Sequence, residues 1–556
     1  MTAMTADDRS GRRTAGLRVL AVAAGLMAMA APLPAQDSDS LAITPAELGA
    51  RLRFLSSDLF EGRAPGTRGE ALTTQYLISE MASFGVQPGG AEGGWLQPVS
   101  IVVHAADSTS PNAARVTGRI THTLEHGREV RLSNYTAKPE VRAGGELVFV
   151  GYAIHAPAYG WSDFAGVDLR GKVAVFLLGE PTTAGDTTLF NGDRASRFGW
   201  LTGKVSEVER RGAVGALWVR PGARLSPAPP TGPRRLAADA ERATLQFGGM
   251  ITDSALAALL PPGATFATLL ERAGRRGFRP MPLGVRLEVA FRTQPRTVTT
   301  HNVIGSVAGR DSSLAAEHVA LSAHWDAYGI GPAVNGDSIY NGALDDGSGV
   351  TALLALARVL ANNPQRRSIT FLFTTAEEWG LLGAEAFVTA GPLPTNRIVA
   401  NLNLDHGVEL MGRMRDAAPL GIELSSLRRN VEEVAARSGL RVSPDPYPEE
   451  GFFLRSDQFP FARAGIPALY MAMGTDGETS SRAQVDSAVA NYLQHHYHRP
   501  SDEYETVVLD LDGARQFAEF VRDVTISVAN RDDRPVWNAG SEFQRSDAHA
   551  TAGAER

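Results

Sequence analysis

The chain has 556 residues, of which 43% are hydrophobic and 21% are charged, and it contains no cysteine. This composition is typical of a globular protein, and it excludes a collagen-like or disordered chain, disulfides, thiolate metal sites and a cysteine nucleophile. The net charge of −7 argues against a nucleic-acid partner held by a basic surface.

Residues 1–35 have the pattern of a secretory signal peptide. Arginines surround the start of an apolar run at residues 19–31, and a short segment of proline and small residues follows at 32–35. The run is shorter than the roughly 20 residues that a membrane-spanning helix needs, although a membrane anchor is the alternative interpretation. We expect cleavage after Ala35, export to the periplasm or the medium, and no stable membrane anchor in the mature chain.

The rest of the chain falls into regions that differ in their sequence pattern. Residues 41–90 are predicted to contain two helices, the first beginning at Thr44-Pro45 and the second near residue 68. From about residue 126 to 290, short β-type runs alternate with Gly, Pro and Asp, which predicts a separate β-rich unit without a recognisable catalytic set. Residues 541–556 are polar and are expected to be disordered.

From residue 302 onward, strand and helix patterns alternate. Strands are predicted at residues 319–322, 368–375, 398–404 and 466–473, and helices at 348–360 and 511–530. This alternation predicts an α/β fold in which a mostly parallel central sheet is covered by helices on both faces, giving a three-layer α/β/α sandwich.

Histidine and carboxylate residues follow the predicted strands at the points where the strands end. In open α/β sheets, sites form outside the carboxyl ends of the strands, so these side chains are expected to converge. Each residue alone is more simply explained as a helix cap, a surface group or a core histidine. Taken together, nitrogen and carboxylate ligands without cysteine suit zinc or another divalent transition metal. The residues concerned are His324, Asp326, Asp345, Asp346, Glu377, Glu378, Asp405 and His498.

Five segments together resemble the zinc-site motifs of metallopeptidase family 28, and they occur in the order found in that family. They are Ser322-Ala323-His324-Trp325-Asp326, Gly342-Ala343-Leu344-Asp345-Asp346-Gly347-Ser348-Gly349, Thr375-Ala376-Glu377-Glu378-Trp379-Gly380, Asn403-Leu404-Asp405 and Tyr497-His498-Arg499-Pro500-Ser501-Asp502. The resemblance covers residues 41–125 and 291–535 as the catalytic domain, with the zinc-dependent exopeptidase fold. The segment 126–290, with Gly151-Tyr152-Ala153-Ile154-His155-Ala156-Pro157 and Gly171-Lys172-Val173-Ala174-Val175, resembles a protease-associated insert.

The resemblance implies two Zn²⁺ per chain, with Co²⁺ or Mn²⁺ as substitutes. It assigns His324 and Asp405 to one ion, Glu378 and His498 to the other, and Asp345 to both. Asp326 would orient the imidazole of His324.

The same resemblance makes Glu377 the general base that acts on a metal-activated bridging water. It implies that Tyr497 stabilises the oxyanion, with a packed aromatic side chain as the alternative interpretation. Glu449 would bind the free amine of the substrate, although a solvated acidic turn is equally compatible with the sequence. Relatives commonly have His where this chain has Gln458.

The resulting hypothesis is an exported dizinc aminopeptidase that acts on peptides. One alternative is a carboxypeptidase or dipeptidase of the same fold, for which Arg455 offers a basic group toward a carboxylate. Another is an inactive peptidase fold that binds peptides. The full ligand set argues against a glutaminyl cyclase. The sequence leaves the preferred side chain and the oligomeric state open.

Overall fold

The computed structural model describes residues 42–110, 112–181, 189–190, 196–225, 230–405, 411–507 and 510–544. The predicted signal peptide at 1–35 lies outside these residues. Residues 541–544 belong to the segment that was expected to be disordered, yet Phe543 is buried and stacks against Trp537 with ring centroids 5.2 Å apart. The remainder of that segment lies outside the described residues.

The centre of the peptidase-like region is a sheet in which neighbouring strands run parallel. The order β21-β18-β14-β17 is parallel throughout, and β13 continues it as an antiparallel neighbour of β17. The predicted strands are present. The bounds of these strands are β13 Met281–Val307, β14 His318–His324, β17 Ser368–Thr374, β18 Ile398–Leu404 and β21 Ala468–Met471.

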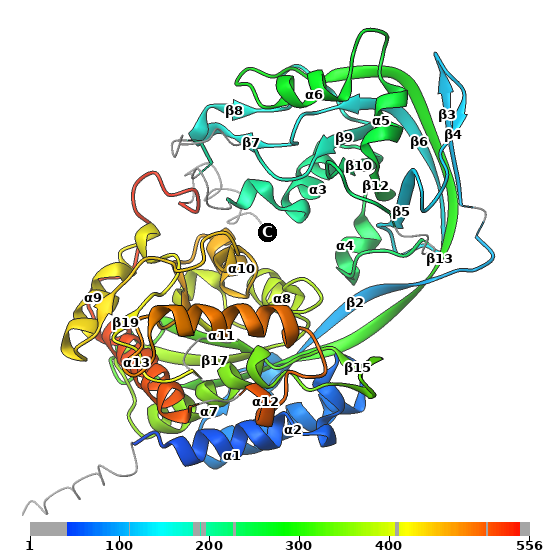
Figure 1. Ribbon diagram of the computed structural model, residues 1–556. Coiled ribbons are helices and arrows are strands. Elements are labelled where there is room, and N and C mark those ends of the chain that lie inside the picture. Colours follow the sequence, from blue (N-terminus) through cyan, green and yellow to red (C-terminus); the bar gives the residue numbers. More distant parts are fainter. Residues whose placement is uncertain are drawn as a thin grey trace, which may run out of the picture. The chain divides into compact units, whose positions relative to one another are not determined.

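Helices cover both faces of this sheet, as predicted (Figure 1). Successive residues of a strand point to opposite faces. Leu321 and Phe371 therefore lie in a core with α1, α2, α7, α9 and α13, whereas Ala320 and Leu372 pack with α8 and α10. The helix bounds are α1 Pro45–Leu55, α2 Arg68–Ser83, α7 Ser348–Ala361, α8 Leu382–Ala390, α9 Leu427–Arg437, α10 Gln458–Arg463, α11 Arg482–His495, α12 Tyr504–Val507 and α13 Leu511–Asn530.

A β-rich segment with its own hydrophobic cores precedes this sheet. Its central strands β6, β9, β10 and β12 pair in parallel, and β5 closes one edge. Val116 of β3 contributes to one of these cores, upstream of the predicted boundary at residue 126. The bounds are β3 Ala113–Gly118, β4 His122–Thr123, β5 Val130–Asn134, β6 Glu140–Phe149, β7 His155–Ala156, β8 Trp161–Ser162, β9 Val173–Leu177, α3 Leu201–Arg210, β10 Gly215–Val219, α4 Ala237–Arg242, β12 Phe247–Ile251, α5 Asp253–Leu259 and α6 Phe266–Ala273.

One long strand joins the two sets of strands. The 27-residue β13 pairs with β6 and β3 over its first half and with β17 over its last residues. Between these ladders it pairs with β2 (Leu96–Ala106), from Thr293 opposite Ala106 to Val303 opposite Leu96. Strand β2 in turn pairs with the short β11 (Arg235–Leu236). The remaining short strands are β1 Gln87–Pro88, β15 Gly329–Val334, β16 Asp337–Tyr340, β19 Asp416–Ala417 and β20 Arg441–Val442.

We expect the core beneath α7 to govern the stability of the central sheet. Leu353 is fully buried in α7, so Leu353→Ala should lower the free energy of unfolding by about 2–5 kcal/mol, because it removes apolar contacts and leaves a cavity. Leu59 is 64% exposed, and Leu59→Ala should change that free energy by less than about 0.5 kcal/mol. Denaturant unfolding measures both, and equal losses would contradict the assignment of Leu353 to the core.

Candidate metal centre

The structure brings the five predicted metal-binding residues together at the carboxyl edge of the parallel strands. His324 is the last residue of β14, Asp405 follows β18, and Glu378 lies four residues after the end of β17. Asp345 lies in the turn before α7, and His498 lies between α11 and α12. Two groups of possible ligand atoms result, one from His324, Asp345 and Asp405 and one from Asp345, Glu378 and His498; within each group the atoms lie within 4.8 Å of one another.

Asp345 is the residue that both groups share. Its Oδ1 lies 3.1 Å from Nε2 of His324, and its Oδ2 lies 3.2 Å from Nε2 of His498. Nε2 of His324 is also 3.8 Å from Oδ1 of Asp405, and Nε2 of His498 is 3.3 Å from Oε2 of Glu378. The two oxygens of one carboxylate therefore face two separate sets of nitrogen and oxygen atoms.

Buried carboxylates outnumber the cationic groups in this cluster. Burial raises the pKa of Glu377 and of Glu378 well above its ordinary value, and neighbouring carboxylates raise both further. Burial lowers the pKa of His324, but the charges of Glu377, Asp345 and Asp405 outweigh burial and raise it well above its usual range. Such shifts arise where buried carboxylates exceed the nearby cationic groups, and a divalent cation would relieve this imbalance.

Hydrogen bonds fix the imidazole of His324 with Nε2 facing Asp345. Its Nδ1 donates to the main-chain carbonyl of Asp326 at 3.1 Å, whereas the Asp326 carboxylate is 3.8 Å away. That carboxylate instead accepts from the backbone N–H of Glu377 at 3.1 Å. Asp326 thus orients His324 through its backbone and holds the start of the Glu377-Glu378 segment through its side chain.

Three further residues position the ligands, and none was given a role from the sequence. Asp346 accepts from the backbone N–H of His324, and Asp502 accepts from that of Asp345, both at 3.1 Å. Arg63 is fully buried and donates to the carbonyls of Trp325, Asn341 and Gly342 at 2.6–2.8 Å. Asp346 and Asp502 lie within the recognised motifs, whereas the only local sign of Arg63 is its place in a glycine-rich segment.

The predicted substrate-binding residues divide into two groups. Nη2 of Arg455 donates to the hydroxyl of Tyr497 at 3.1 Å, and the Tyr497 ring stacks on His498 with centroids 3.6 Å apart. The hydroxyl of Tyr328 lies 3.0 Å from Nδ1 of His498. Glu449 is exposed, and among the contacts of the described residues none joins it to the cluster.

The family comparison covers the part of the chain that contains every one of these ligands. The model of peptidase family M28 matches residues 302–525. The chain carries a peptidase family M28 domain. The predicted fold class agrees with this family and with the sheet described above.

Two relatives that are similar in sequence show how much of the chain is matched. A probable leucine aminopeptidase 2 of Aspergillus fumigatus is 29% identical over 217 residues, which are 38% of this chain and 41% of that protein. A vacuolar membrane protease of Candida tropicalis is 44% identical over 90 residues, which are 16% of this chain and 9% of that protein. The chain thus spans less than half the length of either relative.

A solved structure shares the fold over nearly the whole chain. The aminopeptidase from Aneurinibacillus sp. strain AM-1 aligns with 89% of this chain and 96% of its own, with a TM-score of 0.50 and 20% identity. At this identity, the similarity establishes the fold. Within the described residues, no helix is both long enough and apolar enough to cross a membrane.

In the M28 domain, Gln458 has a structural role close to the metal-ligand residues. It is fully buried, and its Oε1 accepts from Nδ2 of Asn403, two residues before Asp405. Its Nε2 donates to the carbonyls of Phe452 and Phe453 at 3.2 and 2.7 Å. Gln458 therefore ties the end of β18 to the segment that leads to Arg455.

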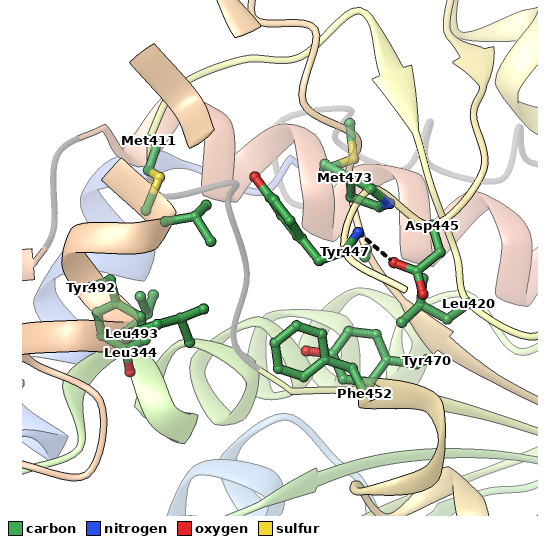
Figure 2. A pocket seen from close by; sticks show the side chains of 13 residues that line it. Leu344, Met411, Leu420, Asp445, Tyr447, Phe452, Tyr470, Met473, Tyr492 and Leu493 are labelled. Carbon is green, nitrogen blue, oxygen red and sulfur yellow. Dashed lines mark hydrogen bonds between the residues drawn. The ribbon is translucent and has the colours of Figure 1, made fainter. Parts of the chain in front are cut away.

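An apolar pocket of the M28 domain is lined in part by Leu344, the residue before Asp345 (Figure 2). Aromatic and aliphatic side chains dominate its lining, and a backbone N–H of Tyr447 donates to Asp445 at its rim. The labelled lining residues are Leu344, Met411, Leu420, Asp445, Tyr447, Phe452, Tyr470, Met473, Tyr492 and Leu493.

The cluster opens onto a separate, open cleft. Glu377, Glu378 and His498 line this cleft, together with Tyr497 and Arg455. The site therefore adjoins a polar, open cleft, and the apolar pocket is lined by the residue next to Asp345.

We expect Arg63 to be essential for the geometry of the metal centre. Arg63→Met removes a buried cation near several carboxylates and takes away the donor to the carbonyls of Trp325 and Asn341, so the free energy of unfolding should fall by about 3 kcal/mol or more. Zinc affinity should fall with it.

Arg53→Met is the matched control, because Arg53 is 64% exposed and its ion pair with Glu505 lies at the surface. Unfolding by denaturant and zinc titration measure both variants. If Arg63→Met were as stable and bound zinc as tightly as Arg53→Met, Arg63 would not position the ligands.

Proposed function

We propose that this protein is an aminopeptidase that binds two zinc ions and hydrolyses the N-terminal peptide bond of peptides. The observation that carries the proposal is the arrangement around Asp345, whose two oxygens face His324 and Asp405 on one side and Glu378 and His498 on the other. The M28 domain and the aminopeptidase relatives support the same activity.

The donor set fits zinc. Imidazole nitrogens and carboxylate oxygens are common zinc ligands, and each group offers three of them while leaving room for a substrate or solvent oxygen. His324 and Asp405 would hold one ion, Glu378 and His498 the other, and Asp345 both. When bound, zinc polarises the scissile carbonyl and lowers the pKa of water from about 15.7 toward 7.

Glu377 is proposed as the general base. Its backbone N–H is held by Asp326, and it lines the open cleft beside Glu378. The carboxylate of Glu377 would take a proton from the attacking water and pass it to the nitrogen of the leaving amine. Burial raises the pKa of Glu377, which favours holding that proton between the two transfers.

Tyr497 is proposed to stabilise the oxyanion. Its hydroxyl accepts a hydrogen bond from Arg455, and Tyr497 lines the cleft in which a substrate oxygen would lie. A donor aimed at developing negative charge lowers the barrier more than the same donor in water. Burial raises the pKa of Tyr497, and so do Asp345 and Glu378, so the hydroxyl keeps its proton at neutral pH.

The apolar pocket would receive the side chain of the N-terminal residue. Its lining by Phe452, Tyr470 and Leu493 favours large apolar side chains over charged ones (Figure 2). The contact expected between Glu449 and the substrate amine stays a prediction from the resemblance. We further propose that the protein is exported, because its first 35 residues have the order of a signal peptide.

The two adjacent glutamates provide the test of this function. Glu377→Gln keeps the shape of the side chain and leaves the proposed ligands intact, so zinc content should stay unchanged while turnover of a leucine amide falls by about 10²–10⁴. Glu378→Gln should lose zinc, because a neutral amide is a weaker ligand than a carboxylate.

Glu385→Gln is the matched control, since Glu385 lines the same cleft and pairs with Arg463 at its rim. Zinc content by mass spectrometry and kcat should match the wild-type values in this variant. Loss of zinc in Glu377→Gln, with full zinc in an inactive Glu378→Gln, would reverse the two roles. Unchanged turnover in both variants would contradict the roles proposed for Glu377 and Glu378.

A further inference from the structure

Arg234 is an exposed arginine at the open cleft that has no partner of opposite charge among the described residues. It lies in the segment that enters β11, 143 residues before Glu377 in the chain. Its guanidinium carbon is 4.6 Å from the centroid of the Trp379 ring, and Trp379 directly follows Glu377 and Glu378. A residue distant in sequence is therefore placed against the segment that carries the proposed base.

Backbone pairing and packing fix the position of this segment. Arg235 pairs with Val102 and Leu236 pairs with Ile101 in the antiparallel ladder between β11 and β2. Strand β2 is itself paired with β13 over eleven positions. Leu236 and Trp379 pack against the same small core, so the sheet that holds the metal ligands also holds Arg234.

Three of the four other arginines that line the cleft already have partners. Arg235 forms an ion pair with Glu209 at 3.1 Å, and Arg463 pairs with Glu385. Arg455 donates to Tyr497 and lies 3.7 Å from Glu450. Arg234 differs because its neighbour is an aromatic face, which holds the guanidinium without using its N–H groups.

The charges around Arg234 connect it to the metal centre. Partial burial lowers the pKa of Arg234, and the charges of Asp326 and Glu378 raise it. The guanidinium is thus within electrostatic range of the ligand cluster and lies over the ring of Trp379. A planar guanidinium held in this way presents two parallel N–H groups, the geometry that a carboxylate accepts.

We propose that Arg234 binds a carboxylate of the peptide on the leaving-group side of the scissile bond. This inference rests on the proposed aminopeptidase function. Leu344 lines the apolar pocket, whereas Arg234 lines the open cleft together with Glu377, Glu378 and His498. A peptide whose N-terminal side chain fills the pocket would place its leaving group in the cleft that Arg234 lines.

The carboxylate has two possible sources, namely the free C-terminus of a short peptide and an acidic side chain just beyond the scissile bond. A free C-terminus would make peptide length the basis of selection, because the carboxylate reaches Arg234 only in peptides of a limited length. An acidic side chain would make the sequence the basis of selection. A single substrate panel separates the two sources.

The experiment compares the zinc-loaded wild-type protein with Arg234→Gln. The substrates are leucine-alanine peptides of two, three and four residues, each as free acid and as C-terminal amide, and amides with Asp or Glu in the second or third position. We expect the wild-type protein to prefer at least one carboxylate-bearing peptide over its neutral counterpart by about tenfold or more in kcat/KM, and Arg234→Gln to bring that ratio close to one.

Arg242→Gln is the matched control, because Arg242 lies in the following helix and forms a surface ion pair with Asp239; it should keep the wild-type ratio. Dependence on the free terminus at one length identifies the C-terminal carboxylate, and dependence on Asp or Glu identifies an acidic side chain. The same ratio in the wild type and Arg234→Gln would overturn the inference while leaving the function intact. No hydrolysis of any peptide by the zinc-loaded wild type would overturn the proposed function and, with it, this inference.

Discussion

Buried carboxylates repel one another, and this protein gathers six buried aspartates at one edge of its sheet, namely Asp326, Asp345, Asp346, Asp405, Asp457 and Asp502. Such a group stays ionised only where hydrogen-bond donors or cations surround it. Asp346 and Asp502 meet backbone N–H groups, and the buried guanidinium of Arg63 lies near several of the six. The oxygens of Asp345 and Asp405 instead face the two histidines, and these are the atoms that a metal would take.

Because some of these aspartates bind backbone N–H groups, they can hold the metal ligands in a defined geometry although most of the ligands lie in loops. The second aspartate of the Asp345-Asp346 pair holds the backbone of His324 and of Gly349 at the start of α7. Asp502 holds the backbone of Leu344 and Asp345 from a loop close to His498 in the chain. The backbone N–H groups of His324 and Asp345 are thus held by these two aspartates, and the strands beneath provide a rigid support.

The sequence predicts those parts of the site that local patterns encode. Strand ends followed by His324, Glu378 or Asp405 are visible as apolar runs with a polar residue after them, and the structure brings these side chains together. Arg63 and Arg234 leave no such pattern, because their roles depend on contacts across 262 and 145 residues, with Trp325 and Trp379. The role of Asp326 also differs in detail, since backbone geometry decides that its carbonyl, and not its carboxylate, is nearest to Nδ1 of His324.

The central claim is that Asp345 is shared by two zinc ions, and anomalous X-ray scattering from crystals of the zinc-loaded protein, recorded on both sides of the zinc absorption edge, tests it most directly. We predict two zinc peaks per chain, one beside His324 and Asp405 and one beside Glu378 and His498, with Asp345 between them. A single peak in crystals of fully active protein, or two peaks that Asp345 does not join, would contradict the account.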